Sequence, residues 1–328
     1  MRVKVINRFG DPSVFESMEL PKPNLKPGHV LIKVNATSVN QIDCKIRSGA
    51  VTNIAPPFPA ILHGDVAGVI SVASPDVWHF ESGDEVYACA GGVKGCGGAL
   101  AEYMLVDAAL IAKKPRKLSM LEAAALPLVG ITAWDALVNR AHLTKGQSIL
   151  IHGGVGGVGH IALQLANSLG AHVSTTVLKP EEEALAKSLG AHEVILAAER
   201  PEEYVARITK GRGFDVVFDT IGGAHLNESF IAAGIGGIVV TTAARSTNDL
   251  TLMHNKGLTL HVVFMLLPLL KGLNRAPYGD LLEKLARMVD AGQIKPLIDT
   301  STFTLNTISE AHRHLESGQA RGKVVVEI

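Results

Sequence analysis

The segment from Gln147 to Gly159 constrains the fold of this chain more than any other. It reads Gln-Ser-Ile-Leu-Ile-His-Gly-Gly-Val-Gly-Gly-Val-Gly, so an apolar run leads directly into a glycine-rich stretch. Gly154, Gly156 and Gly159 have the G-x-G-x-x-G spacing, which permits a tight turn, the close approach of a pyrophosphate and close packing of a helix on a strand. We therefore predict a buried strand, a turn and a helix over residues 158–169, with the helix N-terminus facing phosphate groups.

Strands and helices alternate in the residues that follow. Apolar and β-branched runs predict the strands, and apolar residues spaced three and four apart predict the helices. Strands are expected at residues 173–177, 193–196, 214–219, 238–242 and 258–264, and helices at 181–189, 202–209, 225–233 and shortly after 242. Together with the strand before the glycines, this layout predicts a doubly wound parallel sheet with helices on both faces.

The two ends of the chain show a different pattern. Residues 1–120 contain short strand patterns separated by proline and glycine, and we expect no helix of any length before about Ser119. Ser119 and Glu122 fit a capping box at a helix start. The tail predicts helices at 279–291 and 308–316 and a last strand at 323–328. We assign residues 1–122 and 267–328 to a mostly-β domain and residues 123–266 to an inserted sheet domain.

Composition excludes several classes of function. Lysine plus arginine and aspartate plus glutamate both number 31, and aromatic residues make up 5%, so neither a nucleic acid nor an anionic membrane surface is an expected partner. Three cysteines are too few for a disulfide framework and suit a reducing compartment. The N-terminus lacks the pattern of a signal peptide, and the apolar run at residues 262–270 is too short to span a bilayer. We expect a soluble, cytoplasmic protein.

Motifs along the whole chain resemble those of the medium-chain dehydrogenase/reductase superfamily, specifically its zinc-free quinone oxidoreductase and enone reductase branch. They include Ser38-Val-Asn-Gln-Ile-Asp-Cys-Lys-Ile-Arg-Ser-Gly49, Gly64-Asp-Val-Ala-Gly68, Gly98-Ala-Leu-Ala-Glu-Tyr103, Ala123-Ala-Ala-Leu-Pro127, Phe214-Asp-Val-Val-Phe-Asp219 and Ala320-Arg-Gly-Lys-Val-Val325. The resemblance implies a GroES-like catalytic domain, built from both chain ends, with a Rossmann domain inserted. It also implies a homodimer that pairs through the last sheet strand, from Thr259 to Phe264.

The end of the second predicted sheet strand bears on the choice of cofactor. In dinucleotide folds an acid about 20 residues after the glycines bonds the ribose of NAD. Val177 lies at that position here, whereas Lys179, Thr175 and Thr176 can meet the extra phosphate of NADPH. We therefore expect NADPH. The alternative is that Lys179 is a solvated turn residue in the field of the three glutamates that follow it.

We expect a set of residues from the glycine motif, the end of the second sheet strand and the positions that flank the sheet domain to bind the cofactor. They are Thr132, Gly154, Val155, Gly156, Gly157, Val158, Gly159, Thr176, Lys179 and Phe264.

No metal site is expected. In zinc members of the superfamily, a cysteine, a histidine and a second cysteine stand where this chain has Asn40, Gly64 and Leu128, and these residues cannot form the sulfur and nitrogen site that zinc prefers. His63, with Cys44 and Asp65 near it in sequence, offers an alternative metal site that we consider inferior to a hydrogen-bonding role for the histidine.

Hydride chemistry without a metal favours substrates whose reduced form tolerates negative charge, such as quinones and α,β-unsaturated carbonyls. Asn40 is the expected donor to the substrate carbonyl, and the resemblance implies that Asn40 and Thr132 lie beside the nicotinamide. Each has a structural alternative: Asn40 as a strand-end residue bonded to its own backbone, and Thr132 as a helix hydroxyl.

Asp43 and Arg47 are expected to form an ion pair that orders their loop. Lys45 and Val51 stand where several quinone reductases carry tyrosine, which argues against an aromatic clamp on the substrate. The expected activity is an NADPH-dependent reduction of quinones or enones. The alternatives are an alcohol dehydrogenase with an atypical zinc site, and a nucleotide-binding sensor or scaffold with little turnover.

Overall fold

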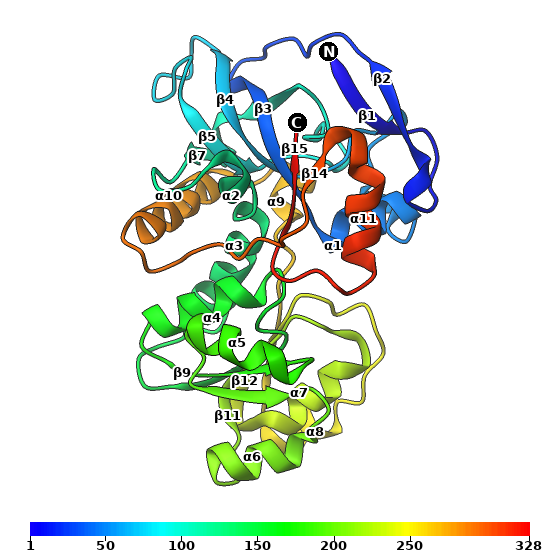
Figure 1. Ribbon diagram of the computed structural model, residues 1–328. Helices are drawn as coiled ribbons and strands as arrows, with labels where there is room; N and C mark the ends of the chain where they lie inside the picture. The colour runs from blue at the N-terminus through cyan, green and yellow to red at the C-terminus, as the bar shows by residue number, and fades with distance from the viewer. The chain divides into compact units, whose positions relative to one another are not determined.

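A computed structural model describes residues 1–328. The chain folds into two compact units (Figure 1). Unit 1 contains Met1–Ile131 and Leu266–Ile328, and unit 2 contains Thr132–Met265. The first boundary lies nine residues beyond the one expected from sequence at 122 and falls inside helix α3 (Pro127–Trp134). The helix continues as a π-helical segment, Asp135–Arg140.

Unit 2 is built on a six-stranded parallel sheet. Its strands are β8 (Ser148–Ile151), β9 (His172–Val177), β10 (Glu193–Leu196), β11 (Phe214–Asp219), β12 (Ala233–Thr241) and β13 (Thr259–Val262), in the order β10-β9-β8-β11-β12-β13. Strand order reverses between β8 and β11, which is the arrangement of a Rossmann fold. The prediction of a doubly wound parallel sheet is therefore confirmed.

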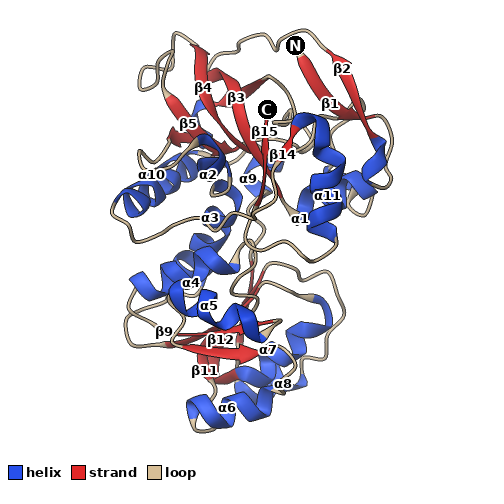
Figure 2. Ribbon diagram, viewed as in Figure 1, coloured by secondary structure: helices blue, strands red, loops and turns tan.

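Helices cover both faces of this sheet (Figure 2). They are α4 (Gly159–Ser168), α5 (Glu183–Ser188), α6 (Pro201–Thr209), α7 (Leu226–Ala232) and α8 (Thr251–Lys256). The apolar side chains of β11 and α7 meet in the interior, where Phe214, Val217 and Phe230 are fully buried. Burial of such side chains stabilises the unit by about 1.5–3 kcal/mol for each one.

Unit 1 is organised around β3 (His29–Val39), the longest strand of the chain. The strand order of its sheet is β14-β15-β3-β4-β5-β7, and β6 (Tyr103–Asp107) also pairs with β3. The other strands are β4 (Asp65–Ala73), β5 (Glu85–Cys89), β7 (Ile111–Lys113), β14 (Phe303–Thr304) and β15 (Val324–Glu327). Strand β15 pairs antiparallel with β3, Val324 facing Val39, so both chain ends close one sheet as expected.

A separate hairpin of β1 (Arg2–Ile6) and β2 (Phe15–Glu19) precedes this sheet. The helices of unit 1 are α1 (Gln41–Ser48), α2 (Met120–Ala124), most of α3, α9 (Leu267–Lys271), α10 (Ala276–Asp290) and α11 (Ile308–Glu316). Ser119 and Glu122 form the predicted capping box at the start of α2. None of the helices combines the length and the apolar composition that a bilayer span requires.

Helix α1 corrects the expectation that no helix precedes Ser119. The backbone N–H of Asn40 donates to Asp43 Oδ2 at 2.8 Å, which caps the first turn, and Gly49 ends the helix with φ = 84°. A left-handed residue after the last turn is a common glycine role. Figure 1 shows α1 beside α11, which lies near the other end of the chain. The sequence does not predict this short helix, because a contact with a distant helix stabilises it and no long periodic pattern marks it.

Candidate active site

The glycine turn of unit 2, residues 152–159, follows β8 at the carboxyl end of the parallel sheet. Gly153 adopts φ = 73°, a backbone conformation that residues other than glycine rarely adopt. Its N–H donates to Thr176 Oγ1 at 3.0 Å, and the N–H of Gly154 donates to Thr176 O at 3.1 Å. The turn is thereby fastened to the end of the neighbouring strand β9.

Two glycines of the motif have no room for a side chain. A Cβ atom on Gly154 would lie 2.2 Å from Thr175 Oγ1, and one on Gly159 would lie 2.1 Å from the carbonyl oxygen of Gly153. Gly156 is less confined, with its nearest neighbour at 3.1 Å. The first and third glycines therefore serve close packing, and the second leaves an open approach to the turn.

The open side of the turn suits an anion. The backbone N–H groups of Val155, Gly157 and Val158 find no acceptor within the protein, although they lie just before or at the N-terminus of α4. Unpaired N–H groups and the positive end of the helix dipole favour phosphate at such a position. The residues present therefore fit the pyrophosphate of a dinucleotide.

The residues at the end of β9 that were predicted to meet the extra phosphate of NADPH have different surroundings. Thr175 is fully buried and its hydroxyl donates to Ile151 O at 2.6 Å, so it is not available to a ligand, contrary to the expectation. Thr176 holds Gly153, as described above. Val177 ends the strand and is 2% exposed.

Lys179 follows on the exposed turn after β9. The carboxylate of Glu182 accepts from the backbone N–H groups of Leu178 and Lys179 at 3.1 and 3.2 Å, and Glu183 pairs with Lys187 at 2.7 Å. Two of the three nearby glutamates are thus engaged with groups other than the ammonium of Lys179.

Thr132 and Phe264 also belong to unit 2. Thr132 lies in α3 and is 5% exposed, whereas Phe264 follows β13 at the carboxyl end of the sheet and is 39% exposed. Phe264 and the glycine turn thus both lie at the carboxyl end of the strands of this sheet.

Asn40 lies in unit 1, where it is 5% exposed at the end of β3. Its amide Nδ2 donates to Asp65 Oδ2 at 2.8 Å, and its Oδ1 accepts from the ammonium of Lys323. The side chain therefore bonds two side chains from distant parts of the sequence.

Asp65 is the centre of this arrangement. Its Oδ2 also accepts from Ser38 Oγ at 2.7 Å, and its Oδ1 accepts from the backbone N–H of Leu128 at 2.8 Å. We call these groups the Asp65 network: the side chains of Ser38, Asn40, Asp65 and Lys323 together with the N–H of Leu128. The network connects the three positions that hold zinc ligands in zinc members of the superfamily. Asn40 and the N–H of Leu128 both bond Asp65, and Gly64 directly precedes Asp65.

Asp43 borders the network through its bond to the N–H of Asn40. Burial raises the pKa of Asp43 to about 7, and the nearby carboxylate of Asp65 acts in the same direction. The hydrogen bond from Asn40 and the charge of Lys323 oppose this shift of the pKa.

Lys323 belongs to the Ala320–Val325 motif, and the sequence alone predicts no role for it. It lies directly before β15, is 2% exposed, and its Nζ contacts Val39 O at 3.2 Å and Asp65 Oδ2 at 3.6 Å in addition to Asn40. Burial lowers the pKa of Lys323 from its ordinary value. A charged residue within the apolar Lys-Val-Val-Val pattern of a predicted strand is the signal that identifies it.

The expected ion pair between Asp43 and Arg47 is wrong. Arg47 pairs with Glu316 on α11 and donates from Nε to His312 Nδ1 at 3.3 Å. The reason is helical geometry: Asp43 caps the first turn of α1, whereas Arg47 in the last turn faces α11.

A pair of buried histidines completes this region. His63 Nε2 and His312 Nε2 lie 2.9 Å apart, and His63 Nδ1 lies 3.3 Å from Thr37 Oγ1, whose hydroxyl donates to Asp65 O. Thr37 therefore accepts from His63 Nδ1, His63 Nε2 accepts from His312, and His312 Nδ1 accepts from Arg47. Burial lowers the pKa of His63 to about 3 and also lowers that of His312, so both rings are neutral.

This chain of hydrogen bonds bears on the alternative metal site at His63. Cys44 Sγ lies 3.4 Å from His312 Nδ1, on the opposite edge of that ring from His63. No group of three or more His, Cys, Asp or Glu side chains is arranged to hold a metal ion.

The two positions where several quinone reductases carry tyrosine differ in exposure: Lys45 is exposed on α1 and Val51 is buried.

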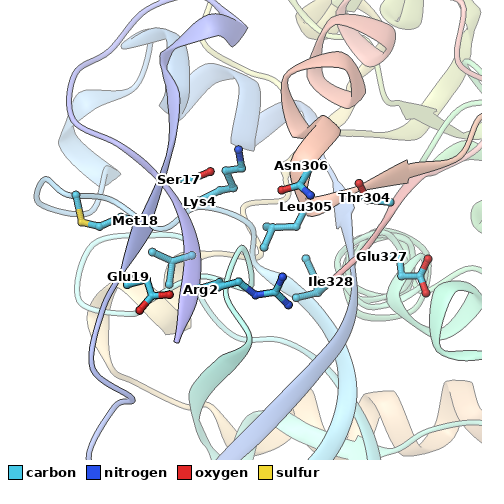
Figure 3. Close-up of a pocket in the computed structure, with 11 residues that line it drawn as sticks. Arg2, Lys4, Ser17, Met18, Glu19, Thr304, Leu305, Asn306, Glu327 and Ile328 are labelled. Carbon is cyan, nitrogen blue, oxygen red and sulfur yellow. The ribbon is translucent and has the colours of Figure 1, made fainter.

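A cavity of about 460 Å³ lies elsewhere in unit 1, between the β1–β2 hairpin and the segment from Thr304 to Asn306 (Figure 3). Arg2, Lys4, Glu19 and Glu327 contribute charges of both signs to its walls. None of the predicted site residues lines it, and its mixed charge selects no class of ligand.

Comparisons with known proteins cover both units. Residues 26–116 match the alcohol dehydrogenase GroES-like domain, and residues 189–326 match the zinc-binding dehydrogenase family. The chain is 30% identical over 335 residues to the quinone oxidoreductase of Pongo abelii, covering 99% of this chain and 97% of that protein. It is 32% identical over 334 residues to the chloroplastic NADPH-dependent alkenal/one oxidoreductase of Arabidopsis thaliana, covering 99% and 79%.

Among solved structures, the Escherichia coli quinone oxidoreductase in complex with NADPH superposes with a TM-score of 0.89 at 26% sequence identity, and the match covers 100% of both chains. These three matches cover 99–100% of this chain, so both units lie within them. The chain therefore belongs to the medium-chain dehydrogenase/reductase superfamily, in its quinone oxidoreductase and enone reductase branch, and is an oxidoreductase that uses a nicotinamide cofactor and a small-molecule substrate.

Proposed function

We propose that this protein is an NADPH-dependent reductase of quinones or α,β-unsaturated carbonyl compounds that works without a catalytic metal. The observation that carries the proposal is the Asn40 amide, which Asp65 and Lys323 hold by both ends in unit 1. A fixed amide donor suits a substrate whose carbonyl oxygen gains negative charge.

The donor set supports a metal-free reaction. Asn40, Gly64 and Leu128 offer an amide, a hydrogen atom and an aliphatic group where zinc members have sulfur and nitrogen ligands. A Cβ atom at Gly64 would lie 2.9 Å from Gly91 O, so this backbone has no space for a histidine there. The oxygen of the Asn40 amide also accepts from the ammonium of Lys323, whose positive charge opposes a cation bound at that oxygen.

The chemistry of the substrate follows from the donor. The bound nicotinamide supplies a hydride, and the protein stabilises the charge that this transfer creates. A quinone or an enone becomes an oxyanion after accepting hydride, and the second N–H of the Asn40 amide can donate to that oxygen. One preorganised donor of this kind is worth about 3 kcal/mol in the transition state. A saturated carbonyl gives a far more basic alkoxide, which one amide stabilises insufficiently.

The end of β9 supports NADPH over NADH. Val177 provides no carboxylate for the ribose hydroxyls of NAD, and Lys179 lies two residues further along on an exposed turn. Because Glu182 and Glu183 are engaged elsewhere, the ammonium of Lys179 is available to a 2′-phosphate. Charge-assisted hydrogen bonds are about twice as strong as neutral ones.

A homodimer through β13 forms part of the proposal. Strand β13 is the last strand of the sheet in unit 2, so its outer edge has no strand partner, and Val262 and Phe264 are 47% and 39% exposed. An uncovered apolar edge favours pairing with a second copy. Sedimentation equilibrium should give twice the chain mass of 34.6 kDa, and a monomer at all concentrations contradicts the dimer.

The test is NADPH oxidation by protein stripped of metal, with NADH in parallel. The acceptors are a naphthoquinone, a 2-alkenal, a 2-alkenone and a saturated aldehyde. We expect turnover of the conjugated acceptors with NADPH and none of the saturated aldehyde. Activity that returns only on addition of zinc would support an alcohol dehydrogenase with an atypical metal site. Binding of NADPH without turnover of any acceptor would support a nucleotide sensor or scaffold.

A further inference from the structure

Lys323 occupies a position where a lysine is costly. Its side chain is 2% exposed, and it has one carboxylate at 3.6 Å and two neutral acceptors for its three N–H groups. Burial of an ammonium is unfavourable unless good partners compensate for lost water, and an apolar residue of similar volume is often at least as stable. Stability alone therefore does not account for a lysine at this position.

The contacts of Lys323 define the orientation of the Asn40 amide. A free asparagine side chain can turn its amide over and exchange oxygen for nitrogen. Lys323 has only N–H donors, so it requires Oδ1 on its side, and the Asp65 carboxylate accepts only, so it requires Nδ2 on the other side. The two neighbours select the same orientation. One hydrogen of Nδ2 is used by Asp65, and we assign the second to the substrate oxygen.

The ammonium also changes the strength of this donor. A charged donor on the carbonyl oxygen of an amide draws electron density from its nitrogen, so the remaining N–H becomes a better hydrogen-bond donor. Such cooperative strengthening amounts to about 10–30% for each bond in a chain. The effect is largest where water is excluded, as at Asn40, which is 5% exposed.

We propose that Lys323 is a positioning residue that orients and polarises the Asn40 amide for donation to the substrate oxygen. This inference rests on the proposed function, because it assigns Asn40 to the substrate carbonyl. Lys323 does not contact the substrate itself: all three of its acceptors belong to the protein. Asp65 is the second support of the amide, fixed in turn by Ser38 and by the N–H of Leu128.

The experiment is a double-mutant cycle on turnover of a 2-alkenone or a naphthoquinone with NADPH. Lys323→Met removes the charge and retains the volume, and Asn40→Ala removes the donor. We expect Lys323→Met to lower kcat by about tenfold or more while the Kd of NADPH changes by less than about twofold. In the Asn40→Ala background, the same change should lower kcat by less than about twofold, because there is no amide left to orient.

Two further lysine variants and a control complete the design. Lys323→Arg keeps a charged donor and should restore part of kcat, whereas Lys323→Gln keeps a neutral donor and separates orientation from polarisation. The control is Lys256→Met, since Lys256 donates to the carbonyl oxygens of Phe230, Ile231 and Ala233 at 2.7–3.0 Å without contacting Asn40. It should affect stability and leave kcat unchanged. If Lys323→Met does not fold, the arginine and glutamine variants carry the same test.

The outcomes separate this inference from the proposed function. If Asn40→Ala lowers kcat and Lys323→Met does not, the positioning role is wrong and the proposed function stands. An equal loss from Lys323→Met with and without Asn40 assigns the lysine to direct electrostatics instead. A raised Kd for NADPH assigns it to the cofactor. If Asn40→Ala has no effect on kcat, the proposed role of Asn40 fails first, and the inference fails with it.

Discussion

The glycine turn of unit 2 and the Asp65 network of unit 1 differ in how they are built. The turn presents backbone N–H groups to an anion and consists largely of glycine. At Gly154 and Gly159 a Cβ atom would collide with neighbouring atoms. The network presents one side-chain amide, held by Asp65 and Lys323. Adding atoms should therefore damage the first region, and removing atoms should damage the second.

The largest effect is expected from adding one methyl group to the turn. Gly159→Ala places a Cβ atom 2.1 Å from the carbonyl oxygen of Gly153, so the backbone must move. We expect the free energy of unfolding to fall by about 3 kcal/mol and NADPH binding to be largely lost. Thermal unfolding and a fluorescence titration with NADPH measure both quantities.

Two alanine controls sharpen this prediction. Gly97→Ala has open space around the new Cβ and should change neither quantity. Gly156→Ala, with its nearest neighbour at 3.1 Å, should leave the fold intact and weaken NADPH binding alone. Normal NADPH affinity in Gly159→Ala would show that the turn does not hold the pyrophosphate.

The next largest effect is expected from removing the amide of the network. Asn40→Ala should lower kcat by about 100-fold, equivalent to about 3 kcal/mol, while the Kd of NADPH stays nearly constant. Asn35→Ala is the matched control, because Asn35 lies exposed on the same strand β3. Unchanged kcat in Asn40→Ala, or a change that appears only in the Kd of NADPH, contradicts the assigned role.

The same difference explains what could be predicted from sequence. The glycine turn is contained within 13 consecutive residues, and its strand, turn and helix follow from local pattern. The parallel sheet was likewise predictable, since each of its strands is an apolar run between helices. Asn40 was identified through a resemblance, but its partners were not. Asp65 is 25 residues away and Lys323 is 283 residues away, and no local pattern records that strand β15 lies beside β3.

Errors in the prediction have the same origin. Helix α1 and the pairing of Arg47 with Glu316 both depend on contact between α1 and α11, which lie far apart in sequence. Thr175 was expected near a phosphate because of its position in the chain, whereas the strand turns its hydroxyl toward Ile151 O. Residue type and order identified the elements, and tertiary packing decided the side-chain partners.

A smaller effect is expected from the one charged side chain assigned to the cofactor in unit 2. Lys179→Ala should raise the Kd of NADPH by about tenfold and leave that of NADH unchanged, because a charge-assisted hydrogen bond is worth about 1.5–3 kcal/mol and this one is exposed to water. Lys187→Ala is the control, since Lys187 is exposed on α5 and pairs with Glu183. An equal change for both cofactors would mean that Lys179 acts on a group that NADH and NADPH share.

The smallest effect concerns titration beside the Asp65 network. Burial raises the pKa of Asp43 to about 7, above its value in the unfolded chain, so the folded state retains a proton that the unfolded state releases. The stability that Asp43 contributes is therefore full at low pH and is lost as pH rises through about 7, at no more than about 1.4 kcal/mol for each pH unit.

Asp43→Asn keeps an oxygen for the N–H of Asn40 and removes this proton equilibrium. The unfolding free energy of the wild type minus that of Asp43→Asn should fall between about pH 4 and about pH 7 and level off above. His63 and His312 act in the opposite direction, since their lowered pKa values make the folded state lose stability as pH falls below the usual histidine range, but both proteins share them and the subtraction removes their effect. A difference that does not change with pH would mean that Asp43 stays ionised in the fold, and that Lys323 stabilises two carboxylates beside Asn40 instead of one.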